Sequence, residues 1–295
     1  MTSPAPFTTT VHPFKSPTPH ACAYESGLSS AKNALVFIGG LSDGPHTVPY
    51  PRAIAKALEG RADLNFSVFE FRLKSSFSGF GFARLADDVA DMSALVKYLR
   101  GIGKEKVVLI GHSTGCQDIM EYNSPVYSDI PDVDAFVLQA PVADRGALGM
   151  VLGQQLLDES VRVAKELIDA GNGTAVVPIE ETQNIFGIIS ARRWYALAAP
   201  DGEDNYFSAD LTDEVAGSYW SRFKKPLLIL FSGQDEYMPP SFDKDGLIQK
   251  WKTYCRPGIA SDLSGCIPGA DHRVETADSE KWLVETVVKF LDGLK

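Results

Sequence analysis

Long apolar runs are absent from this sequence of 295 residues. No stretch approaches the roughly 20 apolar residues that a membrane-spanning helix requires, so we expect no membrane partner. The first six residues, MTSPAP, show no basic region followed by an apolar one, which argues against a secretory signal. We therefore expect a cytoplasmic protein.

Cysteine and basic residues are also scarce. The four cysteines form no CxxC pair and no Cys/His cluster, so the sequence predicts no metal site. Cys255 and Cys266 lie close enough in sequence to form a disulfide, but we expect free thiols in a reducing compartment. Lys and Arg total 28 against 38 Asp and Glu, which gives a net charge of −10. Because no basic cluster carries interleaved aromatic residues, nucleic acid is not an expected partner.

The remaining composition, with 44% hydrophobic and 22% charged residues, is that of a globular protein. Apolar runs typical of buried strands occur at residues 34–38, 66–71, 107–110, 135–141 and 227–231. Segments with helical periodicity or helix-start signals occur at residues 51–59, 84–100 and 279–294. This alternation predicts a mostly parallel sheet with helices on both faces. Short apolar segments near residues 11–14 and 21–24 fit an edge hairpin.

Residues 145–220 interrupt the alternation of strands and helices. Residues 149–170 are predicted to form a helix, and aromatic residues are scattered through the rest of the segment. The length suits a helical cap inserted over the carboxyl edge of the sheet. We therefore predict a core of residues 1–144 and 221–295 and a cap of residues 145–220. The aromatic side chains either pack within the cap or line a pocket, and packing is the preferred interpretation.

The most informative stretch joins the predicted strand 107–110 to a predicted helix through Gly-His-Ser-Thr-Gly at residues 111–115. A G-x-S-x-G pentapeptide between a buried strand and a helix is typical of a nucleophile elbow, in which a tight turn exposes the serine above the sheet. We therefore predict Ser113 as a nucleophile. The first amides of the helix, beginning with Thr114, would stabilise negative charge that develops there.

A glycine pair, Gly39 and Gly40, directly follows the predicted strand 34–38. Glycines at this position let the backbone approach another group closely. We expect this loop to face the nucleophile, with Gly40 beside the substrate and the amide of Leu41 as the second oxyanion donor. The alternative is a glycine turn without a catalytic role.

The run at residues 75–82 combines small polar residues, glycines and three phenylalanines. It is too apolar for a plain surface loop and too rich in glycine for a helix. One hypothesis is that the run lines the substrate pocket, with Ser76, Phe77 and Phe80 as binding residues. The other hypothesis is a loop packed against the core.

A serine nucleophile needs a base, and the base needs an acid that holds its tautomer. In the α/β-hydrolase arrangement these residues occur in the order Ser, Asp or Glu, His. His272 is the one histidine that follows Ser113, and Asp235 lies just beyond a late strand, so we predict Ser113, Asp235 and His272 as a triad. Asp144, just beyond the strand before it, is the alternative acid. His112 is expected to point away from the serine.

This triad predicts acyl transfer. The serine attacks a carbonyl, the histidine passes the proton to the leaving group, and water resolves the acyl-enzyme. No metal or organic cofactor is implied. A serine esterase with a small-molecule ester substrate is the main hypothesis. A thioesterase, peptidase or acyltransferase would use the same residues, and a non-catalytic binding protein on a hydrolase fold is a third possibility.

Three motifs together resemble one fungal branch of the α/β-hydrolase superfamily: FIGGLSDG at 37–44, SSFSGFG at 75–81 and GHSTGCQD at 111–118. That branch includes cytosolic esterases that open ester bonds in fusarinine-type siderophores after iron uptake. The resemblance implies an α/β-hydrolase fold, the triad named above, and a hydroxamate ester substrate in its ferric or iron-free form. Ile38 replaces the histidine of the HGG motif found in many lipases and esterases, which argues against a lipase-like substrate.

Overall fold

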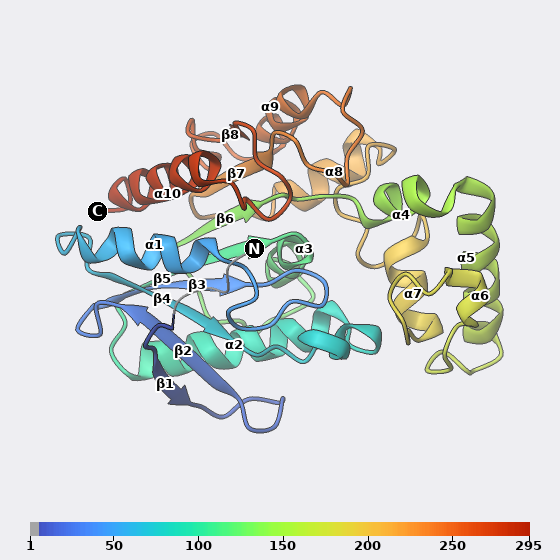
Figure 1. Ribbon diagram of the computed structural model, residues 1–295, viewed down its shortest axis with the longest axis horizontal. Helices are drawn as coiled ribbons and strands as arrows, with labels where there is room; N and C mark the ends of the chain where they lie inside the picture. The colour runs from blue at the N-terminus through green and yellow to red at the C-terminus, as the bar shows by residue number, and fades with distance from the viewer. Residues whose placement is uncertain (1–5) are drawn as a thin grey trace.

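The computed structural model describes residues 6–295, so the first five residues, part of the segment discussed for a targeting signal, lie outside the described residues. Eight strands of the described chain form one sheet in the order β1-β2-β4-β3-β5-β6-β7-β8 (Figure 1). The strands are β1 (Thr10–Pro13), β2 (Cys22–Gly27), β3 (Asn33–Ile38), β4 (Phe66–Phe71), β5 (Lys106–His112), β6 (Ala135–Gln139), β7 (Leu227–Ser232) and β8 (Gly265–Ile267). β1 and β2 pair antiparallel with their neighbours, and the pairings from β4 to β8 are parallel. The sheet is therefore mostly parallel, with the expected hairpin at one edge.

Helices follow most of the parallel strands. They are α1 (Tyr50–Glu59), the short 3-10 helix η1 (Phe77–Gly81), α2 (Leu85–Gly101), α3 (Thr114–Tyr122), α4 (Asp144–Leu152), α5 (Gln154–Asp169), α6 (Ile179–Thr182), α7 (Ala191–Ala198), α8 (Asp213–Trp220), α9 (Lys244–Tyr254) and α10 (Ala277–Asp292). The helices predicted at 51–59, 84–100 and 279–294 are present, with bounds shifted by one or two residues. The single helix predicted at 149–170 is wrong. The chain turns between α4 and α5 at Gly153, whose φ of +78° lies in the left-handed region that glycine adopts readily.

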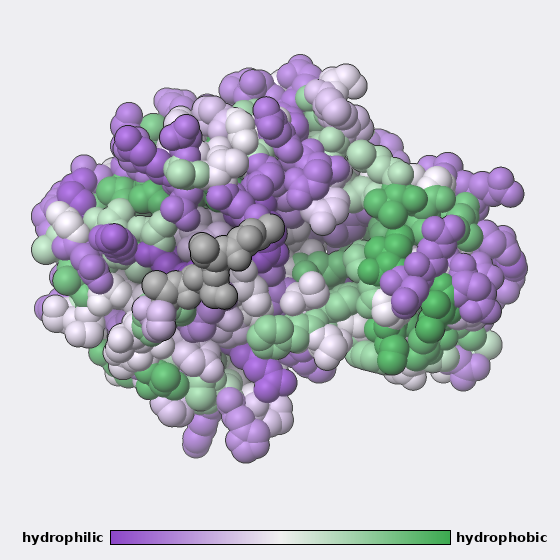
Figure 2. Space-filling view, in the orientation of Figure 1, coloured by the Kyte–Doolittle hydropathy of each residue, from purple (hydrophilic) through white to green (hydrophobic). Residues whose placement is uncertain are grey.

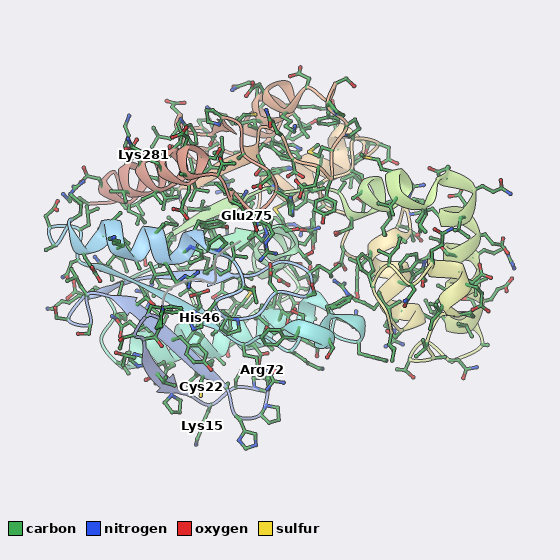
Figure 3. All side chains as sticks on the ribbon, viewed as in Figure 1. Lys15, Cys22, His46, Arg72, Glu275 and Lys281 are labelled. Carbon is green, nitrogen blue, oxygen red and sulfur yellow. The ribbon has the colours of Figure 1, made fainter. Side chains whose placement is uncertain are left out.

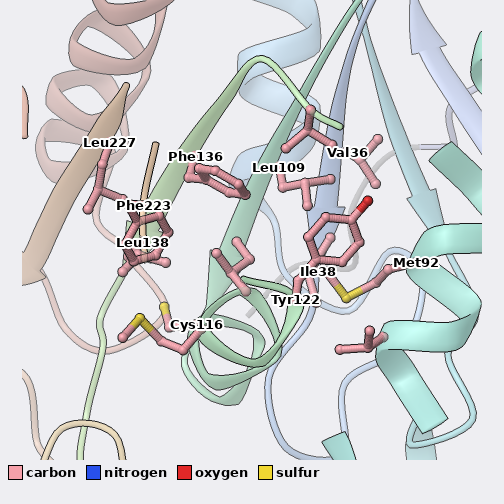
Figure 4. Packing of buried hydrophobic residues seen from close by; sticks show 14 of the residues in the cluster. Val36, Ile38, Met92, Leu109, Cys116, Tyr122, Phe136, Leu138, Phe223 and Leu227 are labelled. Atoms are coloured by element: carbon pink, nitrogen blue, oxygen red, sulfur yellow. The ribbon is translucent and has the colours of Figure 1, made fainter. Parts of the chain in front are cut away.

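Both faces of the sheet are buried, which explains the nearly continuous apolar runs of its strands. Successive side chains alternate between two cores: Val36 and Leu109 pack on one face, and Leu35 and Val108 on the other. Residues of α2, α3, α8 and α9 complete the first core, part of which Figure 4 shows. Residues of α1 and α10 complete the second. This two-sided packing holds the carboxyl ends of the parallel strands along one edge.

A lobe formed by α4 to α7 lies beside the sheet (Figure 1). It has an apolar core of its own, which includes Leu157 and Trp194. The indole N–H of Trp194 donates to the hydroxyl of Ser160 at 3.0 Å. The lobe is joined to η1, where Phe80 packs into the lobe core and the N–H of Ser190 donates to the Gly81 carbonyl at 2.9 Å.

The segment 145–220 therefore divides into two structural parts. Helices α4 to α7 build the lobe, whereas the end of the segment packs on the core of the sheet. Trp220 of α8 is fully buried there and stacks on Trp251 of α9, with ring centroids 4.6 Å apart. Trp194 and Trp220 thus serve packing, one in the lobe and the other on the core of the sheet.

The four cysteines of the chain are free thiols: Cys22 on β2 (Figure 3), Cys116, Cys255 and Cys266. Burial raises the pKa of the Cys255 thiol to about 11 and that of the Cys266 thiol to about 12. Both groups are therefore protonated thiols at neutral pH. In residues 6–295, none of the helices has the length and apolar character needed to cross a membrane.

Candidate active site

Ser113 lies at the turn between β5 and α3, at the carboxyl edge of the sheet. Its φ of +53° and ψ of −122° place it in a region that residues other than glycine rarely occupy. A Cβ atom on Gly111 would lie 2.4 Å from the Gly115 carbonyl oxygen, and one on Gly115 would lie 2.3 Å from that of Ile38. Both positions of the pentapeptide therefore require glycine, because the neighbouring backbone leaves no space for a Cβ atom. The turn has the geometry of a nucleophile elbow.

The histidine and one carboxylate predicted for the triad are in contact. His272 lies beyond β8, Asp235 lies beyond β7, and His272 Nδ1 is 2.8 Å from Asp235 Oδ2. Both side chains are buried. The other oxygen, Asp235 Oδ1, accepts the N–H of Tyr237 at 3.0 Å, which fixes the carboxylate. With Nδ1 held by a carboxylate, Nε2 is the atom left to accept a proton. Asp144, the alternative acid, instead accepts a hydrogen bond from Gln117 Nε2 at 2.6 Å.

Ser113 and His272 open into one cavity of about 380 Å³. The loop after β3 forms part of the wall through Gly40 and Leu41, and the lobe contributes apolar residues. The lining residues that were not predicted from the sequence include Leu148, Val151, Ile185, Phe186, Tyr237 and Arg273. The helical spacing of Leu148 and Val151 is visible in the sequence, but it does not tell which of them faces a pocket. Figure 2 shows apolar side chains gathered over the lobe, and Val151 is 60% exposed.

The two predicted oxyanion donors flank the serine. Thr114 is the first residue of α3, and Leu41 lies in the loop after β3. Within residues 6–295, neither backbone N–H donates a hydrogen bond, so both are available to a substrate oxygen. The loop comes very close to the nucleophile, because a Cβ atom on Gly40 would lie 2.8 Å from Ser113 Cβ. Gly40 therefore lies at the wall of the cavity.

We expect Gly40→Ala to lower kcat by about 100-fold, because the added methyl group displaces the loop that carries the Leu41 amide. The matched control is Gly101→Ala at the end of α2, where an added Cβ has nothing within 4 Å. Hydrolysis of p-nitrophenyl acetate measures the effect. If Gly40→Ala keeps at least half of the wild-type kcat, the loop is not the second donor.

The loops that carry the predicted acid, base and oxyanion donor are tied together. Arg273 Nη1 donates to Asp43 Oδ1 at 3.1 Å, and Asp43 Oδ2 accepts the N–H of Gly40 at 3.0 Å. Glu236 Oε2 accepts the N–H of His272 at 2.9 Å. The carboxylate of Glu236 thus holds the backbone of the histidine loop. Sequence reasoning missed Asp43 and Arg273, because no local pattern reveals a contact across 230 positions.

The ring of His112 is buried and packs against that of His272, with ring centroids 4.9 Å apart. Its Nδ1 is 2.5 Å from Gln139 Oε1, an acceptor, so Nδ1 carries the proton. Burial lowers the pKa of His112 to about 3, and the nearby His272 ring adds to the decrease. His46 lies apart from this pair, bound to Glu70 at 2.7 Å (Figure 3).

A neutral buried His112 predicts acid sensitivity. Its pKa is near 6.5 in the unfolded chain and about 3 in the folded protein. Below pH 6.5 the unfolded chain therefore binds a proton that the folded protein does not, so stability falls as the pH drops toward 3. Between pH 7 and pH 5 we expect His112 to account for about 2 kcal/mol of lost unfolding free energy.

Urea unfolding of the wild type and of His112→Asn at pH 7, 6 and 5 measures this loss. Asparagine keeps a donor for Gln139 but does not titrate, so the wild type should lose about 2 kcal/mol more than the variant. Parallel losses in the two proteins would show that His112 does not bind a proton on unfolding.

The run at residues 75–82 does not line the cavity at Ser76, Phe77 or Phe80. The Ser76 hydroxyl accepts the N–H of Leu73 at 3.0 Å within a turn. The ring of Phe77 covers Gly44, where a Cβ would lie 2.1 Å from the ring. Phe80 packs against Phe186, with ring centroids 5.7 Å apart. The run therefore packs against the lobe and also against the loop after β3, where the N–H of Phe77 donates to the carbonyl of Asp43 at 3.1 Å.

In the part of the chain from residue 6 onward, no group of three or more His, Cys, Asp or Glu side chains is arranged to hold a metal ion. The cavity thus combines an elbow serine, a carboxylate-bound histidine and free backbone amides with walls that contain apolar residues of the lobe and the charged Asp43, Asp144 and Arg273. These groups are suited to nucleophilic attack on a carbonyl carbon.

The sheet is mostly parallel and covered on both faces, and a nucleophile elbow, an acid and a histidine follow three of its strands. These features define an α/β-hydrolase fold. Residues 1–292 match the model of the family described as "Protein of unknown function (DUF1749)", and the chain belongs to this family.

Named relatives agree with this fold and family. The fusarinine C esterase sidJ of Aspergillus fumigatus is 29% identical to this chain, and the match covers 92% of each protein. An esterase of Emericella nidulans is 31% identical, covering 92% of this chain and 89% of the relative. The solved structure of the siderophore hydrolase EstB from Aspergillus fumigatus superimposes with a TM-score of 0.83 at 28% identity, covering 98% of this chain and 99% of that one. The predicted fungal α/β-hydrolase branch is confirmed.

Proposed function

We propose that this protein is a serine esterase that uses Ser113, His272 and Asp235 as its catalytic triad. The observation that carries the proposal is the 2.8 Å contact between His272 Nδ1 and Asp235 Oδ2, in a histidine that shares its cavity with the elbow serine. The esterase and hydrolase names of the relatives support the coarser conclusion that the chain is a carboxylic ester hydrolase.

The reaction follows from these positions. Ser113 Oγ attacks the ester carbonyl while His272 Nε2 takes its proton, and Asp235 stabilises the imidazolium. The negative charge on the carbonyl oxygen is stabilised by the amides of Leu41 and Thr114, each worth about 3–4 kcal/mol in comparable enzymes. The imidazolium then protonates the leaving alkoxide. Water, deprotonated by the same histidine, hydrolyses the acyl-enzyme and restores the serine.

The proposed substrate is a fusarinine-type hydroxamate siderophore, cleaved inside the cell so that its iron is released. The names of two relatives support this substrate, since one is a fusarinine C esterase and the other a siderophore hydrolase. Iron enters the site as cargo of the substrate, in the ferric complex, or is absent from the iron-free form.

The test is incubation of the protein with ferric and iron-free fusarinine-type siderophores, followed by mass spectrometry of the products. Ser113→Ala and p-nitrophenyl acetate are the control variant and control ester. Linear or monomeric hydroxamates produced by the wild type only would support the proposal. Hydrolysis of p-nitrophenyl acetate without siderophore cleavage would reject the siderophore, and hydrolysis of neither would reject the esterase.

A further inference from the structure

Gln139 is a fully buried polar residue at the end of β6, directly behind the candidate active site. It pairs with His112 in the parallel register of β5 and β6, so it lies level with the residue that precedes the nucleophile. Its main-chain carbonyl accepts the N–H of Ser113 at 3.0 Å. The backbone of Gln139 therefore holds the backbone of the elbow serine.

The side chain of Gln139 reaches the loop that carries the histidine. Gln139 Nε2 donates to the His272 carbonyl at 3.4 Å and to the Ser232 hydroxyl at 3.1 Å. Gln139 Oε1 accepts the hydroxyl of Tyr50 at 3.1 Å and lies 2.5 Å from His112 Nδ1. One residue thus contacts the nucleophile through its main chain and the loop of the base through its side chain.

The orientation of this amide is determined by its partners. A carbonyl can only accept a hydrogen bond, so the nitrogen of Gln139 faces His272 and the oxygen faces His112. The ring of His112 then packs against the ring of His272, with centroids 4.9 Å apart. Gln139 therefore acts on His272 by two routes, directly at its carbonyl and indirectly through the ring of His112.

The backbone that follows Gln139 is strained in the same way as the elbow. Ala140 has a φ of +52°, close to the +53° of Ser113, and its N–H donates to the Leu230 carbonyl at 2.7 Å. Two neighbouring strands thus end in a left-handed residue at the same level of the sheet. Such residues persist where their surroundings fix them, and they are concentrated at active sites. The strain after β6 therefore indicates a functional constraint on Gln139.

We propose that Gln139 is a positioning residue that fixes the distance and angle between Ser113 and His272. This inference rests on the proposed ester hydrolysis and adds to it a residue that acts through the backbone of both partners. The imidazole must take a proton from the serine and pass it to the leaving group, and a misplacement of about 1 Å costs about 100-fold in rate. Gln139 therefore supports kcat and not substrate binding.

Gln139→Met tests the inference, because methionine has nearly the same length and offers no comparable donor or acceptor. The measured quantity is kcat for p-nitrophenyl acetate per site that a fluorophosphonate labels to completion. Unfolded chains neither hydrolyse nor label, so this quantity does not depend on the fraction that is folded. We expect it to fall about 100-fold, with KM within about twofold of the wild type.

The matched control is Asn33→Leu, which removes an amide from the amino end of β3, the opposite end of the sheet. Asn33 Nδ2 donates to the Leu64 carbonyl at 2.9 Å, and Asn33 Oδ1 accepts the N–H of Lys106 at 3.1 Å. This variant also loses a donor and an acceptor, but it should keep the wild-type kcat per labelled site. A purely structural role of Gln139 predicts that both variants keep it.

Gln139→Glu is the second variant, and it decides alone if Gln139→Met yields no labelled protein. At pH 9, far above the ordinary glutamate pKa of about 4.3, the carboxylate keeps the shape but turns a negative oxygen toward the His272 carbonyl. The proposal predicts that kcat per labelled site is at least about tenfold below that of the wild type. A carboxylate that acts only through its charge would stabilise the imidazolium and would not lower kcat.

A kcat per labelled site within about threefold of the wild type, in Gln139→Met or at pH 9 in Gln139→Glu, would overturn the role of Gln139 while leaving the esterase intact. An equal loss in Asn33→Leu, or a loss that lies mainly in KM, would overturn it as well. A wild type that neither hydrolyses p-nitrophenyl acetate nor takes the label would overturn the proposed function and this inference together.

Discussion

Replacing Ser113 by alanine is expected to lower kcat for ester hydrolysis by about 10⁶-fold, because no other group can form the acyl-enzyme. The substitution removes one hydroxyl from a half-buried side chain, so the thermal midpoint should change by about 2 °C or less. Steady-state hydrolysis of p-nitrophenyl acetate and a thermal melt measure the two quantities on the same preparation.

The matched control is Ser218→Ala, which removes a hydroxyl from an exposed position of α8 and should leave kcat unchanged. A Ser113→Ala protein that melts like the wild type and keeps more than about 1% of its kcat would show that the nucleophile is another group.

Asp235→Asn is expected to lower kcat by about 10⁴-fold. The amide has nearly the shape of the carboxylate, but its N–H₂ group can donate to His272 Nδ1 and hold the wrong tautomer. It also carries no charge to stabilise the imidazolium. The measurement is again kcat for p-nitrophenyl acetate, followed from pH 6 to pH 9.

Two further substitutions make this prediction specific. Asp271 is the neighbour of His272 in the sequence, and its carboxylate accepts the N–H of Glu275 at 2.8 Å. Asp271→Asn should therefore lower kcat by less than about tenfold. Asp144→Asn tests the alternative acid. If the 10⁴-fold loss appears in Asp144→Asn and not in Asp235→Asn, the catalytic acid is Asp144.

The parts of the fold that depend on local sequence could be predicted. Buried strands can be recognised as apolar runs, because a sheet that is covered on both faces exposes neither set of side chains to solvent. The glycines at 111 and 115 are visible because the turn leaves no space for a Cβ atom at either position. The chain order Ser113, Asp235, His272 predicted the contact between the last two, since the carboxyl ends of parallel strands meet at one edge.

Contacts between distant segments could not be predicted. The position of His112 depends on Gln139, which lies on the neighbouring strand and binds its Nδ1. Phe80 has the composition of a pocket residue, but η1 directs it into the core of the lobe. Gly153 alone does not reveal the break between α4 and α5, because isolated glycines also occur within helices. The break can be recognised only from the way the two helices pack. In each case the position is determined by residues that are distant in the sequence or by the packing of the whole lobe.

The most direct test of the central claim, that Ser113 is an activated nucleophile, is covalent labelling with a fluorophosphonate followed by peptide mass spectrometry. The account predicts one adduct per chain, on the peptide that contains Ser113, with no label in Ser113→Ala and much slower labelling in Asp235→Asn. An adduct on a different serine, or the absence of any adduct from a preparation that hydrolyses esters, would contradict it.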